Sequence, residues 1–154
     1  MKKLLFLIVV GTVLILTACD NSRGTTTVCT TAPSWVMPSA GNITVTIESL
    51  NGELVTWTER ITTTPLEYGL FFWGFELYND EIEYAFELYA EPIDGISWNL
   101  ISISGNTLVF EATVHYDSLT DAEISEIWGI NSAQVTLTTA TRSLEVQGAT
   151  CRTN

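Results

Sequence analysis

An alternation of apolar and polar residues begins at Asn42 and has the period of two that a half-buried β-strand requires. Its apolar positions are Ile43, Val45 and Ile47. Asn51-Gly52 follows, and this pair is the commonest two-residue hairpin turn because both positions tolerate a positive φ. The apolar side of the return strand consists of Val55, Trp57 and Ile61. Pro65 then interrupts the ladder, so the pattern predicts a β-hairpin between Asn42 and Pro65.

The same alternation returns in residues 96–116 and predicts a second hairpin. The apolar positions of its first strand are Ile96, Trp98 and Leu100. Gly105-Asn106 supplies a second turn signal. The returning strand alternates strictly at Leu108, Phe110, Ala112, Val114 and Tyr116.

A helical spacing separates the two hairpins. The residues at i, i+3, i+4 and i+7 of this segment are Ile82, Ala85, Phe86 and Tyr89. Asn79 or Asp80 can cap its start, and Pro92 with Gly95 ends it. Because residues 70–75 have no clean period, the pattern leaves open whether the helix begins near Leu66 or near Asp80.

Two more helices are predicted towards the C-terminus. Thr120 and Glu123 form a capping box before an apolar face of Ile124, Ile127 and Trp128, and Gly129 stops that helix. Ala133, Val135 and Leu137 favour a short strand, and residues 139–147 a last helix with Ala140 and Leu144 inward. Two hairpins interleaved with helices predict an α+β fold, in which an antiparallel sheet built from two β-hairpins has helices packed on one face.

The first 18 residues have the pattern of an export signal. Lys2 and Lys3 precede an apolar run of about 15 residues, which is short of the roughly 20 that cross a bilayer. The run ends in Leu16-Thr17-Ala18-Cys19, which resembles the lipobox of bacterial lipoproteins. We therefore expect cleavage before Cys19 and lipid on its thiol, which holds the chain to the cell membrane, facing outside the cytoplasm. An ordinary secreted protein is the alternative.

The residues after the lipobox are polar as far as Thr31 and show no apolar periodicity. We expect residues 1–18 to be a signal peptide, residues 19–41 a flexible lipid-anchored tether, and residues 42–151 a single α+β domain. Within the tether, Pro33 and Pro38 flank Trp35 and Val36, which indicates an extended segment that packs onto the domain.

Composition restricts the partners. From Cys19 onward the chain has no lysine, so four arginines face 18 acidic residues and the formal net charge is −14. Because phosphate backbones are bound through lysine and arginine, we expect no nucleic-acid partner. An anionic membrane surface repels such a chain, whereas a cationic partner or a cation is compatible with it.

Two cysteines remain once Cys19 carries lipid. An even count outside the cytoplasm favours one disulfide between Cys29 and Cys151, and two free thiols are the alternative. Closing so long a loop contributes on the order of 4 kcal/mol in the chain-entropy model. The Cys-x-x-Cys spacing of redox enzymes does not occur.

The C-terminal third contains Tyr116-Asp117 at the end of a strand, the helix of residues 121–128, Gly129, and Gln147-Gly148 after the last helix. In these features it resembles the YehR-like lipoproteins, a bacterial family of unknown function. The early hairpin and the lipobox also fit this family. The chain departs from it in having no lysine after the leader. The resemblance implies an α+β domain on a lipid anchor, and it implies no catalytic residues.

An aromatic run is the best candidate for a binding surface. It contains Phe71, Phe72, Trp73 and Phe75. Packing in the core is the favoured interpretation of these residues. The alternative is a groove for an apolar ligand, a peptide or a partner lipoprotein.

Groups that carry chemistry are sparse. His115 is the only histidine, so neither a Ser-His-Asp site nor a histidine metal cluster is expected, and its side chain should lie on the outer face of its strand. Glu83, Glu87 and Glu91 share one helical face. A solvated face is the favoured interpretation of these carboxylates, and a cell-envelope hydrolase with paired carboxylates or a calcium-dependent binding protein is the alternative.

These observations favour a non-enzymatic binding or accessory module on a lipid anchor. We expect no catalytic residue, no metal and no cofactor. The expected partners are the membrane, through the lipid on Cys19, and an unidentified envelope protein or ligand.

Overall fold

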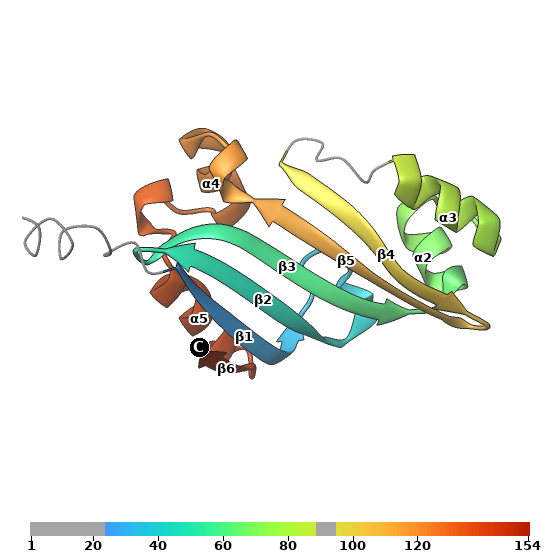
Figure 1. Cartoon of the computed structure of the whole chain (residues 1–154), viewed down its shortest axis with the longest axis horizontal. Coiled ribbons are helices and arrows are strands. Elements are labelled where there is room, and N and C mark those ends of the chain that lie inside the picture. The colour runs from blue at the N-terminus through green and yellow to red at the C-terminus, as the bar shows by residue number, and fades with distance from the viewer. Residues whose placement is uncertain (1–23, 89–94) are drawn as a thin grey trace, which may run out of the picture.

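The computed structural model describes residues 24–88 and 95–154. They form a six-stranded antiparallel sheet in the order β4-β5-β3-β2-β1-β6. Figure 1 shows helices α2 and α3 at one end of this sheet and helices α4 and α5 at the other. The predicted fold class, an antiparallel sheet with helices on one face, is confirmed. Cys19 and the leader lie outside the described residues.

The described residues form six strands, four α-helices and three 3-10 helices. The strands are β1 (Gly24–Pro33), β2 (Asn42–Leu50), β3 (Glu53–Thr63), β4 (Ile96–Ser104), β5 (Thr107–His115) and β6 (Thr150–Thr153). The α-helices are α2 (Pro65–Phe72), α3 (Asn79–Leu88), α4 (Asp121–Trp128) and α5 (Leu137–Val146). The short 3-10 helices are η1 (Pro38–Ala40), η2 (Tyr116–Ser118) and η3 (Ser132–Gln134). None of the described helices is long and apolar enough to cross a membrane.

Both predicted hairpins are confirmed. Asn51 and Gly52 join β2 to β3 with φ angles of 55° and 85°, as their turn type requires. A bulge opposite Ser49 shifts the register, so that Leu54 is buried in the place where we expected Val55. The inner residues of β2 and β5 are buried as the alternation predicts: Ile43, Val45, Ile47, Leu108, Phe110, Ala112 and Val114.

The predicted tether is wrong from Gly24 onward. Residues 24–33 form β1, which pairs with β2 on one side and with β6 on the other. Threonine has a high β-propensity but gives no apolar alternation, which is why the pattern concealed this strand. Its inward hydroxyls have partners: Thr25 Oγ1 lies 2.7 Å from Ser49 Oγ, and Thr27 Oγ1 lies 2.8 Å from Thr153 Oγ1. The domain therefore extends from Gly24 through β6 rather than from 42 to 151.

The helices predicted on both sides of the second hairpin are present in the structure. Of the two starting points left open for the first helix, both are occupied, because α2 begins at Pro65 and a separate helix, α3, begins at Asn79. Thr120 and Glu123 form the predicted capping box of α4, and Gly129 ends it with a φ of 66°. Ala140 and Leu144 are the buried residues of α5, as predicted. The short strand predicted from Ala133, Val135 and Leu137 is wrong: residues 132–134 form η3, Thr136 makes an isolated bridge to Glu53, and Leu137 begins α5.

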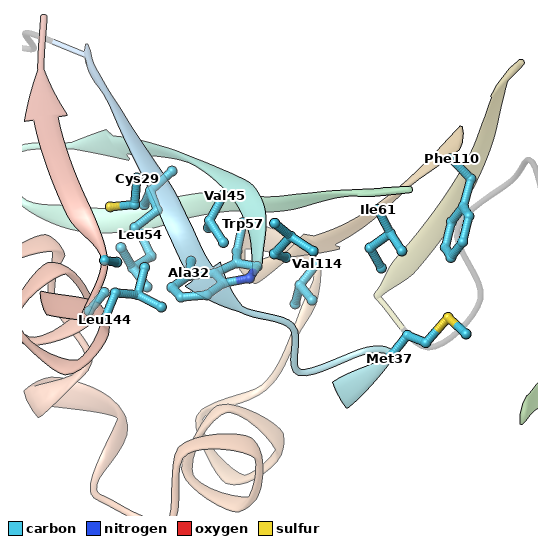
Figure 2. Packing of buried hydrophobic residues seen from close by; sticks show 14 of the residues in the cluster. Cys29, Ala32, Met37, Val45, Leu54, Trp57, Ile61, Phe110, Val114 and Leu144 are labelled. Atoms are coloured by element: carbon cyan, nitrogen blue, oxygen red, sulfur yellow. The ribbon is translucent and has the colours of Figure 1, made fainter. Parts of the chain in front are cut away.

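The segment between β1 and β2 crosses the core face of the sheet, and we call residues 34–41 the strap. Its Met37 is buried, and Figure 2 shows it near Ile61 and Phe110. The strap is bound by the carboxylate of Glu59, which points into the core from the middle of β3 and is 0% exposed. The strap thus covers the part of the sheet between the two pairs of helices.

The Glu59 carboxylate accepts hydrogen bonds from four donors. Ser34 Oγ donates to Oε2 at 2.6 Å, and Trp57 Nε1 donates to Oε1 at 3.1 Å. The backbone N–H of Trp35 lies 3.0 and 3.1 Å from the two carboxylate oxygens, and that of Val36 lies 3.2 Å from Oε2. Because a buried carboxylate is costly without partners, this set of donors is what allows Glu59 to lie in the core.

Replacing Glu59 with glutamine should lower the free energy of unfolding by about 2–3 kcal/mol. The amide presents one acceptor oxygen and an NH₂ group to four donors, so some buried N–H and O–H groups lose their partner. Urea denaturation measures the change. The control is Glu111→Gln, which removes an exposed ion pair with Arg60 (3.5 Å) and should cost less than about 1 kcal/mol. Equal denaturation midpoints for the two variants would show that the buried carboxylate does not hold the strap.

The candidate cysteines form a disulfide in the structure. Cys29 on β1 lies directly opposite Cys151 on β6, and the two are 122 residues apart in sequence. Because the linked loop spans nearly all of the described chain, the bond restricts the unfolded state strongly. It also fastens β6, which is only four residues long, to the edge of the sheet.

Removing this bond with Cys29→Ser and Cys151→Ser should lower the free energy of unfolding by about 2–4 kcal/mol. The urea midpoint of the double variant measures this change. The unmodified protein in excess reductant is the control and should reach a similar midpoint. If neither treatment moves the midpoint, the pairing of β1 with β6 does not depend on the disulfide.

Candidate functional site

The candidate site is the lobe formed by α2, α3 and the linker between them, residues 65–88, which we call the aromatic lobe. A capping box fixes its start, since the Thr64 hydroxyl accepts from Glu67 N while the Glu67 carboxylate accepts from Thr64 N. Hydrogen bonds from Thr63 and Thr64 lower the pKa of Glu67. Helix α2 ends at Phe72, just before Gly74 takes a φ of 78°.

The linker folds back over α2 because Gly69 has no side chain. A Cβ at this position would lie 2.6 Å from the backbone oxygen of Phe75 and 2.9 Å from the backbone nitrogen of Leu77. Helix α3 then begins, and the Glu81 carboxylate accepts a hydrogen bond from Tyr78 N at 2.8 Å. Ile82, Ala85 and Phe86 of α3 are buried, as their spacing predicts.

Phe110 of β5 joins the lobe to the sheet. Its ring is fully buried and lies 5.5 Å, centroid to centroid, from both Tyr68 of α2 and Phe86 of α3. Phe72 meets Trp98 of β4 edge to face at 5.4 Å. Such aromatic pairs add to the burial energy and fix the orientation of the rings. The lobe is therefore packed on the sheet along its inner side.

A hollow opens between this aromatic packing and the outer surface. Its volume is about 330 Å³, and it is lined by Tyr68, Phe72, Trp73, Ala85, Phe86 and Trp98. That volume lies within the range of small-ligand sites, and aromatic side chains are their usual lining.

The structure decides between the two interpretations of the aromatic run. Phe72 packs against the core and lines the hollow, in keeping with the favoured interpretation. Phe71, Trp73 and Phe75 are 48%, 40% and 57% exposed, so core packing is wrong for these three. Other large apolar side chains of the lobe are exposed beside them: Leu66, Leu70, Tyr78, Tyr84 and Leu88. The run is thus a surface with a hollow next to it.

Sequence reasoning missed four residues that line the hollow, namely Tyr68, Ala85, Phe86 and Trp98. Phe86 and Trp98 were recognised only as inward positions of a helix and a strand. Because β4 is the edge strand and the helices do not cover it completely, Trp98 is only partly buried. Incomplete cover of an edge strand depends on tertiary packing, which the local pattern does not contain.

The predicted carboxylate set gives no enclosed site. Glu83 and Glu87 are exposed on α3, and Glu91 lies outside the described residues. Both line an open groove of about 300 Å³ with Phe86, Trp98, Asn99 and Leu100. In the described part of the chain no three histidine, cysteine, aspartate or glutamate side chains are grouped as a metal site would require.

Two other polar groups are held away from the hollow. The ring of His115 lies on the open face of the sheet, where Nε2 is 2.8 Å from Ser97 Oγ. The hydroxyl of Tyr116 accepts a hydrogen bond from Trp128 Nε1 at 3.0 Å in a cluster with Trp35 and Trp57. The pKa of Tyr116 is raised to about 12, mainly by burial; the hydrogen bond from Trp128 opposes this rise and the negative charge of Glu59 adds to it.

Comparison of the chain with protein-family models, with curated proteins and with solved structures found no match.

Proposed function

We propose that this protein is a non-enzymatic binding protein of the cell envelope, anchored by lipid outside the cytoplasm, which binds a partner through the aromatic lobe. The observation that carries the proposal is the exposure of Phe71, Trp73 and Phe75 in the run whose Phe72 and Trp73 line an apolar hollow. Contiguous apolar surface of this kind marks interaction sites, because leaving it in water has a free-energy cost.

The polar groups support binding rather than catalysis. Glu59 is saturated by donors from the strap and from Trp57, so its carboxylate is not available to a substrate. Glu83 and Glu87 are exposed and lack the enclosure that tunes a catalytic acid. The carboxylates from which the hydrolase alternative was predicted therefore do not support it.

The anchor is proposed from the leader and from Leu16-Thr17-Ala18-Cys19. Membership of the YehR-like lipoproteins is proposed from the residues of the C-terminal third, and the antiparallel α+β fold agrees with what that resemblance implies. A lipid anchor makes a small binding protein effective because it confines the search for an envelope partner to the membrane surface.

Cys19→Ser should abolish anchoring. Mass spectrometry of the membrane fraction should show that the protein without the substitution starts at Cys19 and carries lipid on its thiol. The variant should either keep its leader or be released from the membrane. Val146→Ser is the control, because it changes an exposed side chain outside the lipobox and should leave the membrane fraction unchanged. An unmodified protein that stays membrane-bound with its leader uncut would overturn the anchor.

Contact at the lobe can be tested in intact cells of the source bacterium. A photoreactive phenylalanine analogue at Phe75 should give a discrete cross-linked adduct, since this side chain of the aromatic lobe is 57% exposed. The matched control places the analogue at Val146, an apolar residue of α5 that is 81% exposed. If the analogue gives the same adducts at Phe75 and at Val146, binding at the lobe is contradicted. It is also contradicted if the analogue gives no adduct at Phe75 or when placed instead at Phe71 or Trp73.

A further inference from the structure

The aromatic lobe is acidic as well as apolar. Between Arg60 and Arg142 the chain contains neither lysine nor arginine. The lobe itself contains six carboxylates, at Glu67, Glu76, Asp80, Glu81, Glu83 and Glu87. All six are exposed or at the surface of the two helices and their linker. Any partner that covers this surface must therefore meet several negative charges together with aromatic rings.

Acidic and apolar groups line the same grooves on the two sides of the lobe. On one side Glu83 and Glu87 lie with Phe86 and Trp98 in the groove of about 300 Å³. On the other side Glu76 and Asp80 line a groove of about 450 Å³ with Pro65, Leu66, Leu77 and Tyr78. The apolar hollow lies next to the first groove, because both are lined by Phe86 and Trp98.

This arrangement disfavours several occupants. A second copy bound through the same lobe would bring six carboxylates against six, and the described part of the chain offers only Arg60, Arg142 and Arg152 to oppose them. Arg60 already pairs with Glu111. An anionic lipid surface or the carboxylate of a fatty acid would meet the same repulsion.

We propose that the occupant is a cationic amphipathic peptide segment. Its apolar side chains enter the hollow, and its lysine or arginine side chains meet Glu83 and Glu87 in one groove and Glu76 and Asp80 in the other. Trp98 supports this occupant, because an aromatic ring next to carboxylates offers a cation–π contact in addition to charge pairing. The inference rests on the proposed binding function and specifies the chemical class of the partner.

The test uses the full-length protein in phosphatidylcholine nanodiscs, with empty nanodiscs as the blank. Three fluorescent peptides of equal length are titrated by anisotropy: leucine with lysine, leucine with glutamine, and leucine with glutamate. The lysine peptide should bind at least about tenfold more tightly than the other two, and salt of about 0.5 M should weaken it strongly.

Two charge variants locate the binding. Glu83→Gln with Glu87→Gln should weaken the lysine peptide about fivefold. The matched control is Glu126→Gln with Glu145→Gln, which removes two exposed carboxylates from α4 and α5 and should leave the affinity unchanged. Phe71→Ser with Phe75→Ser should weaken it about tenfold, and Val146→Ser should have no effect.

Each remaining outcome overturns the inference. Equal weakening by both charge variants would show general attraction to an acidic protein. Equal binding of the glutamine peptide would show an apolar site without charge selection, and the proposed function would stand. If no peptide binds, the class of partner is wrong, and the cross-linking at Phe75 decides separately whether the lobe binds a partner.

Discussion

The carboxylate of Glu59 is the interaction on which the rest of the structure depends. It lies at the centre of the core face, where an unpaired charge would not be tolerated, and its four donors come from Trp57 and the strap. The strap consequently crosses the sheet at a fixed place and seats Trp35 on Trp57 at 4.4 Å. Trp128 of α4 packs edge-on against both rings, so the position of α4 also follows from the charge in β3.

The same sheet holds the aromatic lobe by an apolar contact at its other end. Phe110 is the common neighbour of Tyr68, Phe86 and Trp98, and Gly69 lets the linker pack tightly over α2. Folding therefore explains the inner side of the lobe but not its outer side. Phe71, Trp73 and Phe75 contribute exposed apolar area that a stable domain does not need, and that excess is the physical reason to assign the lobe a partner.

Local sequence patterns predicted the features that interactions between residues close in the sequence determine. The two hairpins, the capping box of Thr120 and the inward face of α5 all follow from turn chemistry, capping or periodicity. Strand β1 was not predicted, because its threonines have a high β-propensity but give no apolar period. The burial of Glu59 was also not predicted, since the sequence around a glutamate between Trp57 and Ile61 does not indicate that the strap will bring hydrogen-bond donors to it. The exposure of Phe71 depends on how α2 packs on the sheet, and this packing is tertiary information that a local pattern does not contain.

The topology also decides where the lobe stands relative to the proposed anchor. Gly24 pairs with Leu50 beside the Asn51-Gly52 turn, whereas α2 follows the far end of β3. Figure 1 shows the start of β1 and the aromatic lobe at opposite ends of the sheet. Since β3 is 11 residues long, about 35 Å of strand separates them. An anchor before Gly24 would therefore attach the chain at the end of the sheet remote from the acidic lobe, and about 35 Å is several Debye lengths. When the sheet stands away from an anionic membrane, the charge of the lobe attracts a cationic partner without repulsion from the lipid.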